Sequence, residues 1–321
     1  MTEEGLVSSQ AGEGTVLITG MAGRLGRRLV RRLHRYRSVI GMGARDVSRL
    51  PLDVTYETID PLRSGARKIF AQKGIKAIIH LGVVHNPHAN HAQAHSRNLL
   101  AFQKVIEFAI RHEIKKVVLL SSANTYGPRA ENAQFLTEKA PLLASGSFSE
   151  MHALVELDMY AQSCFWRNPE LELVILRPAN ILGTVRNAPS NYLRLPVVTT
   201  LMGFDPMVQM VHQDDVVSAI ERSLEPGIRG IFNIAGPPPI HISKAIKLLG
   251  RRSVSLPYSV ARGGLSGLFR LGMSKFPAPE LDFIRYVCMV DDSAAREQLG
   301  YTPAFDLEST LRLVDEERWI G

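Results

Sequence analysis

The stretch that decides the fold runs from Thr15 to Gly26 and reads TVLITGMAGRLG. Its first five residues are apolar or β-branched and stop at a glycine, as a buried parallel strand does. Glycines at 20, 23 and 26 permit a tight turn, close approach of the backbone to a pyrophosphate, and close packing of a helix on the strand. The stretch therefore predicts a dinucleotide-binding loop. The alternative is a glycine turn that no longer holds a ligand.

Strands and helices alternate through the first 180 residues. Strands are predicted at 38–42, 56–59, 76–84, 115–121 and 171–176, and helices at 63–73, 94–112 and 149–167. This alternation predicts an α/β fold with a Rossmann-type, doubly wound parallel sheet. Right-handed crossovers place the loops after the strands along one edge, where a ligand is expected. In the helix at 149–167, Met151, Leu154, Val155 and Met159 are predicted to face the core.

The alternation ends after Pro178, which suggests three parts. We expect a flexible tail at 1–13, a dinucleotide-binding domain at 14–178 and a smaller substrate-binding region at 179–321, from which a strand at 230–235 returns to the sheet. Residues 184–210 show turns and apolar pieces without a strand pattern. The apolar, glycine-rich stretch at 260–285 fits a lid or a helix of the substrate-binding region. The alternative for it is a membrane-surface or partner contact.

Composition is that of a soluble globular protein, with 45% apolar and 21% charged residues in 321. No window approaches 18 uninterrupted apolar residues, so a membrane-spanning helix is not predicted. Cys164 and Cys288 are the only cysteines and lie far apart, which predicts neither a disulfide framework nor a zinc site. The cytoplasm is the expected compartment.

The net charge of +7 is concentrated between Arg24 and Arg37, where seven arginines occur without an acid. Leu25, Leu29 and Leu33 form an apolar stripe at helical spacing, and the arginines fit the solvated outer face of that helix, which would pack on the sheet. The alternative is a surface for anions, namely a cofactor phosphate, nucleic acid or an acidic membrane. Aromatic residues are sparse there, so a platform for stacked bases is not supported.

The end of the second predicted strand bears on the choice of cofactor. NAD-selective sites usually have an acid there to bind the ribose hydroxyls. This chain has Gly43, followed by Ala44 and Arg45. Together with Arg24 in the glycine loop, this favours a 2′-phosphate and hence NADP. Asp46 lies close enough to bind a hydroxyl, so NAD stays open.

Further motifs follow in order along the chain: Ile59-Asp60, Ile79-His80-Leu81-Gly82, Asn98, Ser121-Ser122-Ala-Asn-Thr-Tyr126-Gly127, Leu176-Arg-Pro178-Ala-Asn180, Val211-His-Gln-Asp-Asp-Val216 and Asp292 through Pro303. With the glycine loop, they resemble the extended short-chain dehydrogenase/reductase family, in its NAD-dependent epimerase/dehydratase group. The resemblance covers nearly the whole chain. It implies the Rossmann fold, a nicotinamide cofactor and a small-molecule substrate.

The resemblance also implies roles for individual residues. The cofactor-binding residues would be Gly20, Ala22, Gly23, Arg24, Leu25, Gly26, Arg45, Asp60, Leu81, Gly82, Asn98, Ser121, His152 and Pro178. The substrate-binding residues would be Asn180, His85 and Tyr126, and no metal is implied. A homodimer through the helices at 94–112 and 149–167 is the family's expectation.

The catalytic residues depart from the family's pattern. Ser122 matches the serine that binds the substrate oxygen, but Phe148 and His152 occupy the positions of the family's Tyr-x-x-x-Lys. Glu156, four residues later, supports this register. Phenylalanine has no proton to give, and a histidine with a pKa near 6.5 is mostly neutral at neutral pH unless a partner such as Glu150 raises that pKa. Loss of a positioned acid or base typically costs about 10²–10⁴ in rate. His152 as a replacement base is the alternative to impaired catalysis.

The residues expected near the substrate also depart from the family's pattern. Residues Met207 to Met210 are Met-Val-Gln-Met, where nucleotide-sugar relatives often have an arginine for the diphosphate. A smaller or more lipophilic substrate is therefore expected. The sequence predicts an NAD(P)-binding protein of the epimerase/dehydratase type with altered or impaired acid/base catalysis. The alternatives are a non-catalytic sensor of dinucleotide that acts through a partner, and a nucleic-acid binder that uses the arginine-rich helix.

The histidines between 80 and 95 allow a second interpretation. They are His80, His85, His88, His91 and His95. Imidazoles three or four residues apart are able to converge on a metal. No carboxylate or cysteine is interleaved, so a polar loop above the nicotinamide is the favoured interpretation. Ser121 and Ser122 lack the G-x-S-x-G elbow of a hydrolase.

Overall fold

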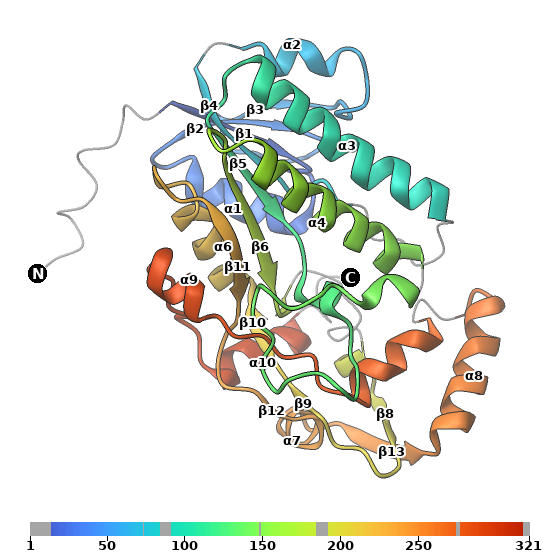
Figure 1. Ribbon diagram of the computed structural model, residues 1–321. Coiled ribbons are helices and arrows are strands. Elements are labelled where there is room, and N and C mark those ends of the chain that lie inside the picture. The colour runs from blue at the N-terminus through green and yellow to red at the C-terminus, as the bar shows by residue number, and fades with distance from the viewer. Residues whose placement is uncertain are drawn as a thin grey trace, which may run out of the picture.

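The computed structural model describes residues 14–72, 74–83, 91–147, 149–183, 192–273 and 277–316. Its centre is a seven-stranded sheet in the order β11-β6-β5-β4-β1-β2-β3 (Figure 1). The strands are β1 (Thr15–Thr19), β2 (Ser38–Met42), β3 (Thr55–Glu57), β4 (Ile75–His80), β5 (Lys116–Leu120), β6 (Glu172–Pro178) and β11 (Gly230–Ile234). All six pairings are parallel. The predicted doubly wound α/β fold is confirmed.

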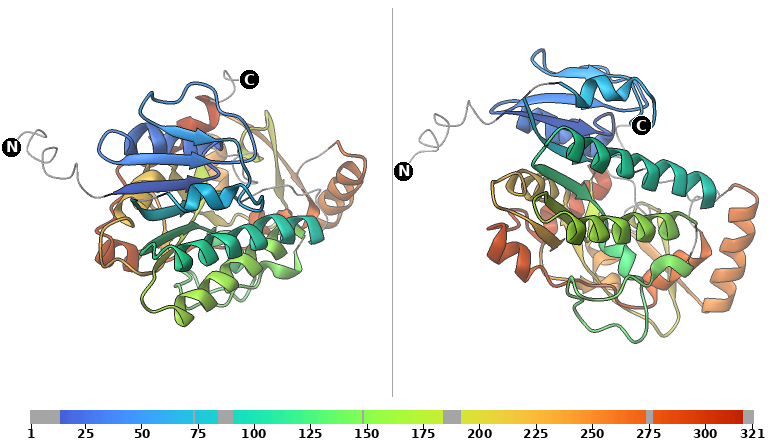
Figure 2. Two further views of the ribbon diagram at one scale, coloured as in Figure 1. Left: turned by 90° about the horizontal axis from the view of Figure 1, so that it is seen from above. Right: turned by 45° about the horizontal axis from the view of Figure 1, so that its top comes forward.

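Helices cover both faces of this sheet. Successive residues of β1 point to opposite faces, so Val16 and Ile18 belong to one buried cluster and Leu17 to another. The first cluster holds α1 (Arg24–Leu33) and α6 (Gln213–Arg222) against the sheet. The second holds α2 (Ala66–Phe70), α3 (His91–Arg111) and α4 (Ser149–Arg167). Figure 2 shows α3 and α4 running side by side.

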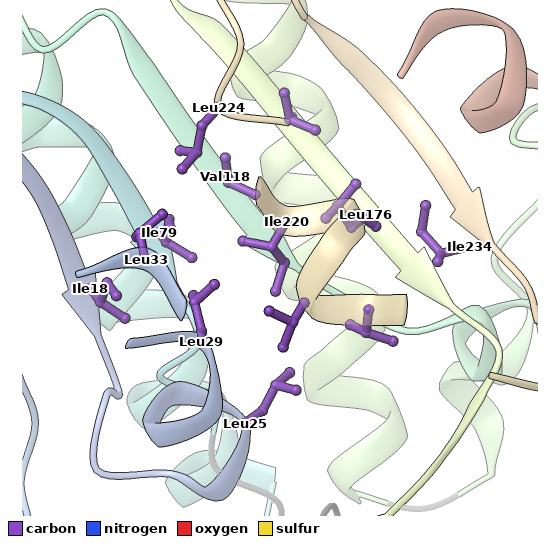
Figure 3. Packing of buried hydrophobic residues seen from close by; sticks show 14 of the residues in the cluster. Ile18, Leu25, Leu29, Leu33, Ile79, Val118, Leu176, Ile220, Leu224 and Ile234 are labelled. Carbon is purple, nitrogen blue, oxygen red and sulfur yellow. The ribbon is translucent and has the colours of Figure 1, made fainter. Parts of the chain in front are cut away.

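The stripe predicted for the arginine-rich helix is buried as expected. Leu25, Leu29 and Leu33 of α1 point into the first cluster, where Ile220 of α6 and Leu224 also lie (Figure 3). One prediction for α4 is wrong, because Met159 is 58% exposed and does not face the core. Its neighbours Met151, Leu154 and Val155 are buried as predicted.

The residues after Pro178 form short strands that the sequence did not predict. These are β7 (Asn180–Leu182) with β10 (Met210–His212), β8 (Val197–Leu201) with β13 (Arg252–Leu256), and β9 (Met207–Val208) with β12 (Ile240–His241). Four of these six strands have only two or three residues, too few for an alternating pattern to stand out.

Besides α6, the described ranges of this region contain the helices α7 (Ile242–Leu248), α8 (Tyr258–Arg270), the 3₁₀ helix η4 (Ala278–Ile284), α9 (Ser293–Gln298) and α10 (Leu307–Glu316). The strand predicted to return to the sheet is β11, which pairs with β6. Within the described ranges, no helix has both the length and the apolar character that crossing a membrane requires.

Candidate functional site

The glycine loop connects β1 to α1 at the carboxyl edge of the sheet. Gly20 has φ +75°, a backbone conformation that residues other than glycine rarely adopt. A Cβ atom added to Gly20 would lie 2.6 Å from the Cα atom of Gly82, because the chain leaving β4 passes directly beside the loop. Leu81 donates its amide to the carbonyl of Thr19 over 3.0 Å. The loop thus brings the ends of β1 and β4 together, as the sequence motifs predict.

The amino end of α1 opens onto this loop. Gly23 is its N-cap and no side chain caps the helix. A Cβ atom on Gly26 would lie 2.7 Å from the Cα atom of Met21, so glycine allows the first turn to pack on the loop. The first amides of a helix have no acceptor within the helix and carry partial positive charge. Backbone packing thus requires glycine in this loop, and amides at a helix end of this kind suit a pyrophosphate.

The side chain of Tyr56 lies against the chain at the end of β2. Its hydroxyl donates to the carbonyl of Arg45 over 2.5 Å, and a Cβ atom on Gly43 would lie 2.8 Å from the same hydroxyl oxygen. A carboxylate side chain therefore does not fit at position 43 unless Tyr56 moves. The Arg45 side chain is exposed. Asp46 accepts the amide of Val47 over 2.8 Å, so its carboxylate stabilises its own turn.

The other predicted cofactor residues lie on several elements around this edge. Asp60 is half-buried and accepts the amide of Leu62 over 2.9 Å. Asn98 on α3 is fully buried. Pro178 is buried at the end of β6.

Ser121 belongs to a buried polar network beneath the edge. Its hydroxyl donates to Asp158 of α4 over 2.5 Å. Asp158 also accepts two hydrogen bonds from Arg177 of β6, over 3.0 and 2.6 Å, and both side chains are fully buried. Burial alone would lower the pKa of Arg177, but the Asp158 carboxylate raises it above its usual value. Asp158 was not among the residues expected from the sequence; its signal is a carboxylate on the inner face of a helix.

Tyr126 is part of the same network. It accepts a hydrogen bond from Arg177 over 2.8 Å and donates one to Asn233 of β11 over 2.9 Å. The residue is 1% exposed, and burial raises its pKa to about 12. These contacts give Tyr126 a structural role and do not favour the predicted contact with substrate.

Ser122 caps the short 3₁₀ helix η2 (Ala123–Tyr126) at the end of β5. Its Oγ accepts the amide of Asn124 over 3.1 Å. A serine hydroxyl that accepts with its oxygen keeps one hydrogen to donate. Ser122 is therefore equipped to bind a substrate oxygen.

His152 is held in place by two neighbours. Its Nδ1 lies 3.0 Å from the carbonyl of Ser145, in the 3₁₀ helix η3 (Ala144–Gly146), and its Nε2 lies 3.5 Å from Glu156. The other Glu156 oxygen lies 2.9 Å from Nδ1 of His95 on α3. The glutamate thus stands between two imidazoles. Glu156, at the helical spacing of four, is thus a partner of His152, whereas the side chain of Glu150, the partner expected from the sequence, lies outside the described residues.

Several predicted positions lie outside the described residues. They include Phe148, His85 and His88, and the side chains of His91 and Glu150. Among the residues that the structure does describe, no group of three or more histidines, cysteines and carboxylates is able to hold a metal ion. His80 is buried and lies 2.6 Å from the Thr19 hydroxyl, and burial lowers its pKa to about 4.

Asn180 lies at the predicted substrate side, on β7. Its amide nitrogen donates to the carbonyl of Gln209 over 3.0 Å. Its Oδ1 is buried without a hydrogen-bond partner in the described part of the chain. Gln209 itself pairs with the amide and carbonyl of Val290, over 2.8 and 2.9 Å, so it supports this region structurally. An unpaired buried acceptor is costly and fits a position that a ligand completes.

The arginine-rich face of α1 is only partly a solvated surface. Arg28 donates to Asp214 of α6 over 2.7 Å, and Arg32 lies 2.5 Å from Glu221 of the same helix. These ion pairs join α1 to α6, a function that neither interpretation of the sequence anticipated. Arg27, Arg31 and Arg35 remain exposed.

Comparison with known proteins places this geometry in a family. The family model described as "NAD dependent epimerase/dehydratase family" matches residues 16–235. An uncharacterized protein of Mycobacterium tuberculosis is 28% identical over 192 residues, which are 59% of this chain and 51% of that protein. A UDP-glucose 4-epimerase of Caenorhabditis elegans is 29% identical over 41% of this chain and 38% of that protein. The chain thus spans about half the length or less of these curated relatives.

Solved structures resemble the whole chain. The UDP-glucose 4-epimerase of Thermotoga maritima with UDP-glucose superposes with a TM-score of 0.72 at 20% identity, covering 95% of this chain and 99% of that one. The UDP-glucuronic acid 4-epimerase of Bacillus cereus, in complex with UDP-glucuronic acid and NAD, gives a TM-score of 0.74 at 17% identity, covering 96% and 100%. At these identities the likeness shows the fold. With the family match over more than half of its length, the chain belongs to the NAD-dependent epimerase/dehydratase family.

Proposed function

We propose that the chain binds NADP(H), with NAD(H) as the second choice, and uses it on a small or lipophilic substrate with altered acid/base chemistry. The observation that carries this proposal is the cradle between Gly20 and Gly26, where a Cβ atom at either glycine would collide with backbone. Such close packing leaves the backbone amides as the surface that meets a ligand. A nicotinamide cofactor supplies hydride chemistry when it is bound.

Residues of the chain would bind the cofactor and the substrate and would transfer the proton. The loop and the amino end of α1 would hold the pyrophosphate, and Ser122 would donate its hydroxyl hydrogen to a substrate oxygen. His152 would bind the nicotinamide ribose or relay a proton, in the place where relatives have lysine. Its contacts with Ser145 and Glu156 fix the ring close to its own helix. Phe148 supplies no proton, so a proton must come from His152, the substrate or water.

Preference for NADP follows from the end of β2. Tyr56 occupies the space that an acid at position 43 would need, and the exposed Arg45 side chain follows directly. A guanidinium binds phosphate oxygens in a bidentate way, whereas a carboxylate would repel them.

Calorimetric titration of the purified protein with NADPH and NADH tests the binding step. NADPH should bind at least tenfold more tightly than NADH, and Arg45→Glu should reverse this order. Arg35→Glu, in the exposed turn after α1, is the matched control and should keep the order. The proposal fails if neither dinucleotide binds.

A Phe148→Tyr, His152→Lys double variant tests the chemical step. Restoring the family's acid and cation should raise turnover of NADPH with carbonyl substrates by about 10²-fold or more, since a positioned acid/base contributes about that factor. Tight NADPH binding with no turnover in either protein would instead favour the non-catalytic sensor.

We also propose a homodimer through α3 and α4. Large apolar side chains are exposed on these adjacent helices: Leu100, Ile110, Met159 and Trp166, at 39–76%. Their exposure suits a partner surface better than solvent. Light scattering should give twice the chain mass, and Met159→Asp with Trp166→Asp should give the single mass. A wild-type protein that stays monomeric at high concentration would contradict this assembly.

A further inference from the structure

Helix α8 carries a second apolar stripe that faces away from the protein. Tyr258, Ala261 and Leu265 pack against the core of the C-terminal region. Val260 and Leu268 of α8, and Leu271 directly after it, are 57%, 44% and 75% exposed. They follow one another at helical spacing, with glycines at 264 and 267 between them.

The stripe continues past the end of the helix. Met273, in the following turn, is 73% exposed. The helix lies at the outer edge of the molecule in Figure 1 and in both views of Figure 2, and its inner side packs against η4 and β8. The apolar surface is thus presented at a corner of the C-terminal region.

The segment of sequence that contains α8 has no acidic residue. No aspartate or glutamate occurs between Glu225 and Glu280. The exposed basic residues of this stretch lie on α7, on β13 and on α8 itself: Lys244, Lys247, Arg252, Arg262 and Arg270. Arg262 and Arg270 are on α8 itself, and Arg262 donates to the hydroxyl of Tyr258 over 3.2 Å. Long basic side chains are able to reach past an apolar face to bind anions. Of the acids on other elements, Asp282 of η4 accepts the Tyr258 hydroxyl over 3.0 Å and Asp315 pairs with Arg251.

We propose that α8 docks on the surface of an anionic lipid bilayer, with Val260, Leu268, Leu271 and Met273 entering the interface and the basic residues binding lipid headgroups. An exposed apolar stripe beside basic side chains is the combination that interfacial helices use. A second copy of the chain fits less well, because a symmetric contact would bring this positive surface against itself. The proposal does not rest on cofactor binding or on turnover.

Sedimentation with vesicles tests the docking. The full chain should bind vesicles of phosphatidylcholine mixed with phosphatidylglycerol, bind pure phosphatidylcholine much less, and lose affinity as salt rises. Leu268→Asp with Leu271→Asp should reduce binding at least tenfold. Arg262→Gln with Arg270→Gln should reduce it by roughly fivefold per arginine.

The matched control is Leu52→Asp, since Leu52 is fully exposed and lies outside the C-terminal region. It should bind anionic vesicles like the wild type. All three sites are exposed, so circular dichroism should show folded variants. The proposal is overturned if the wild type binds neither vesicle, if Leu52→Asp weakens binding as much as the α8 variants, or if the α8 variants change only the mass in solution.

Discussion

At the scale of single residues, we expect loss of the contact between Asp158 and Arg177 to lower the stability of the protein most. Both side chains are fully buried, and Ser121 and Tyr126 depend on the same pair. Breaking a buried pair leaves an uncompensated charge and typically costs about 3–5 kcal/mol. We expect Asp158→Ala to lower the free energy of unfolding by that amount in urea denaturation. Glu308→Ala, in an exposed pair with Arg312, should change it by less than about 0.5 kcal/mol.

His80 should make stability depend on pH. Burial lowers its pKa to about 4, whereas the unfolded chain binds the proton near pH 6.5. The stabilisation is therefore complete above pH 6.5 and is lost as the pH falls toward 4, by up to about 3 kcal/mol. Burial lowers the pKa of His212 to about 4 as well, so both act in the same direction.

Urea midpoints measured from pH 7 to pH 4.5 check the effect of His80. A His80→Asn variant should show a shallower loss of stability with falling pH than the wild type. The exposed His241→Asn should follow the wild-type curve. Equal slopes for all three proteins would show that His80 does not contribute.

At the scale of elements, α1 shows what the sequence is able to predict. The leucine stripe was visible at helical spacing, and the structure buries Leu29 completely. Truncation of a buried leucine typically costs about 2–5 kcal/mol. Leu29→Ala should lower the free energy of unfolding by that amount, while Arg31→Ala on the exposed face should change it by less than about 0.5 kcal/mol. A small effect of Leu29→Ala would mean that α1 is held chiefly by its ion pairs.

Long, periodic elements and motif spacing were thus readable from the sequence. The helix at 149–167 was predicted with the bounds that the structure gives α4. The short strands after Pro178 were not, because their partners lie far along the chain and two or three residues show no period. Contacts between elements were also hidden. The pairing of Arg28 with Asp214 and the place of Glu156 between His95 and His152 depend on how helices pack.

At the scale of the whole molecule, buried residues join the dinucleotide-binding part to the C-terminal region. Strand β11 and helix α6 come after Pro178 yet lie in the same buried cluster as β1 and α1. In β7 and β10, Ile181 and Val211 belong to that cluster, whereas Leu182 and Met210 belong to the core of the C-terminal region. Alternate residues of two short strands therefore connect both cores.

This connection predicts that the chain unfolds as one unit. Thermal unfolding followed by far-ultraviolet and by near-ultraviolet circular dichroism should give one coincident transition. Phe232→Ala on β11, at 1% exposure, should cost about 3–5 kcal/mol and move both signals together, while the exposed Phe135→Ala should move neither by more than about 0.5 kcal/mol. Two separate transitions, with Phe232→Ala shifting only one, would mean that the bridge through β7 and β10 is too weak to couple the cores. In that case the C-terminal region could open without disturbing the glycine loop.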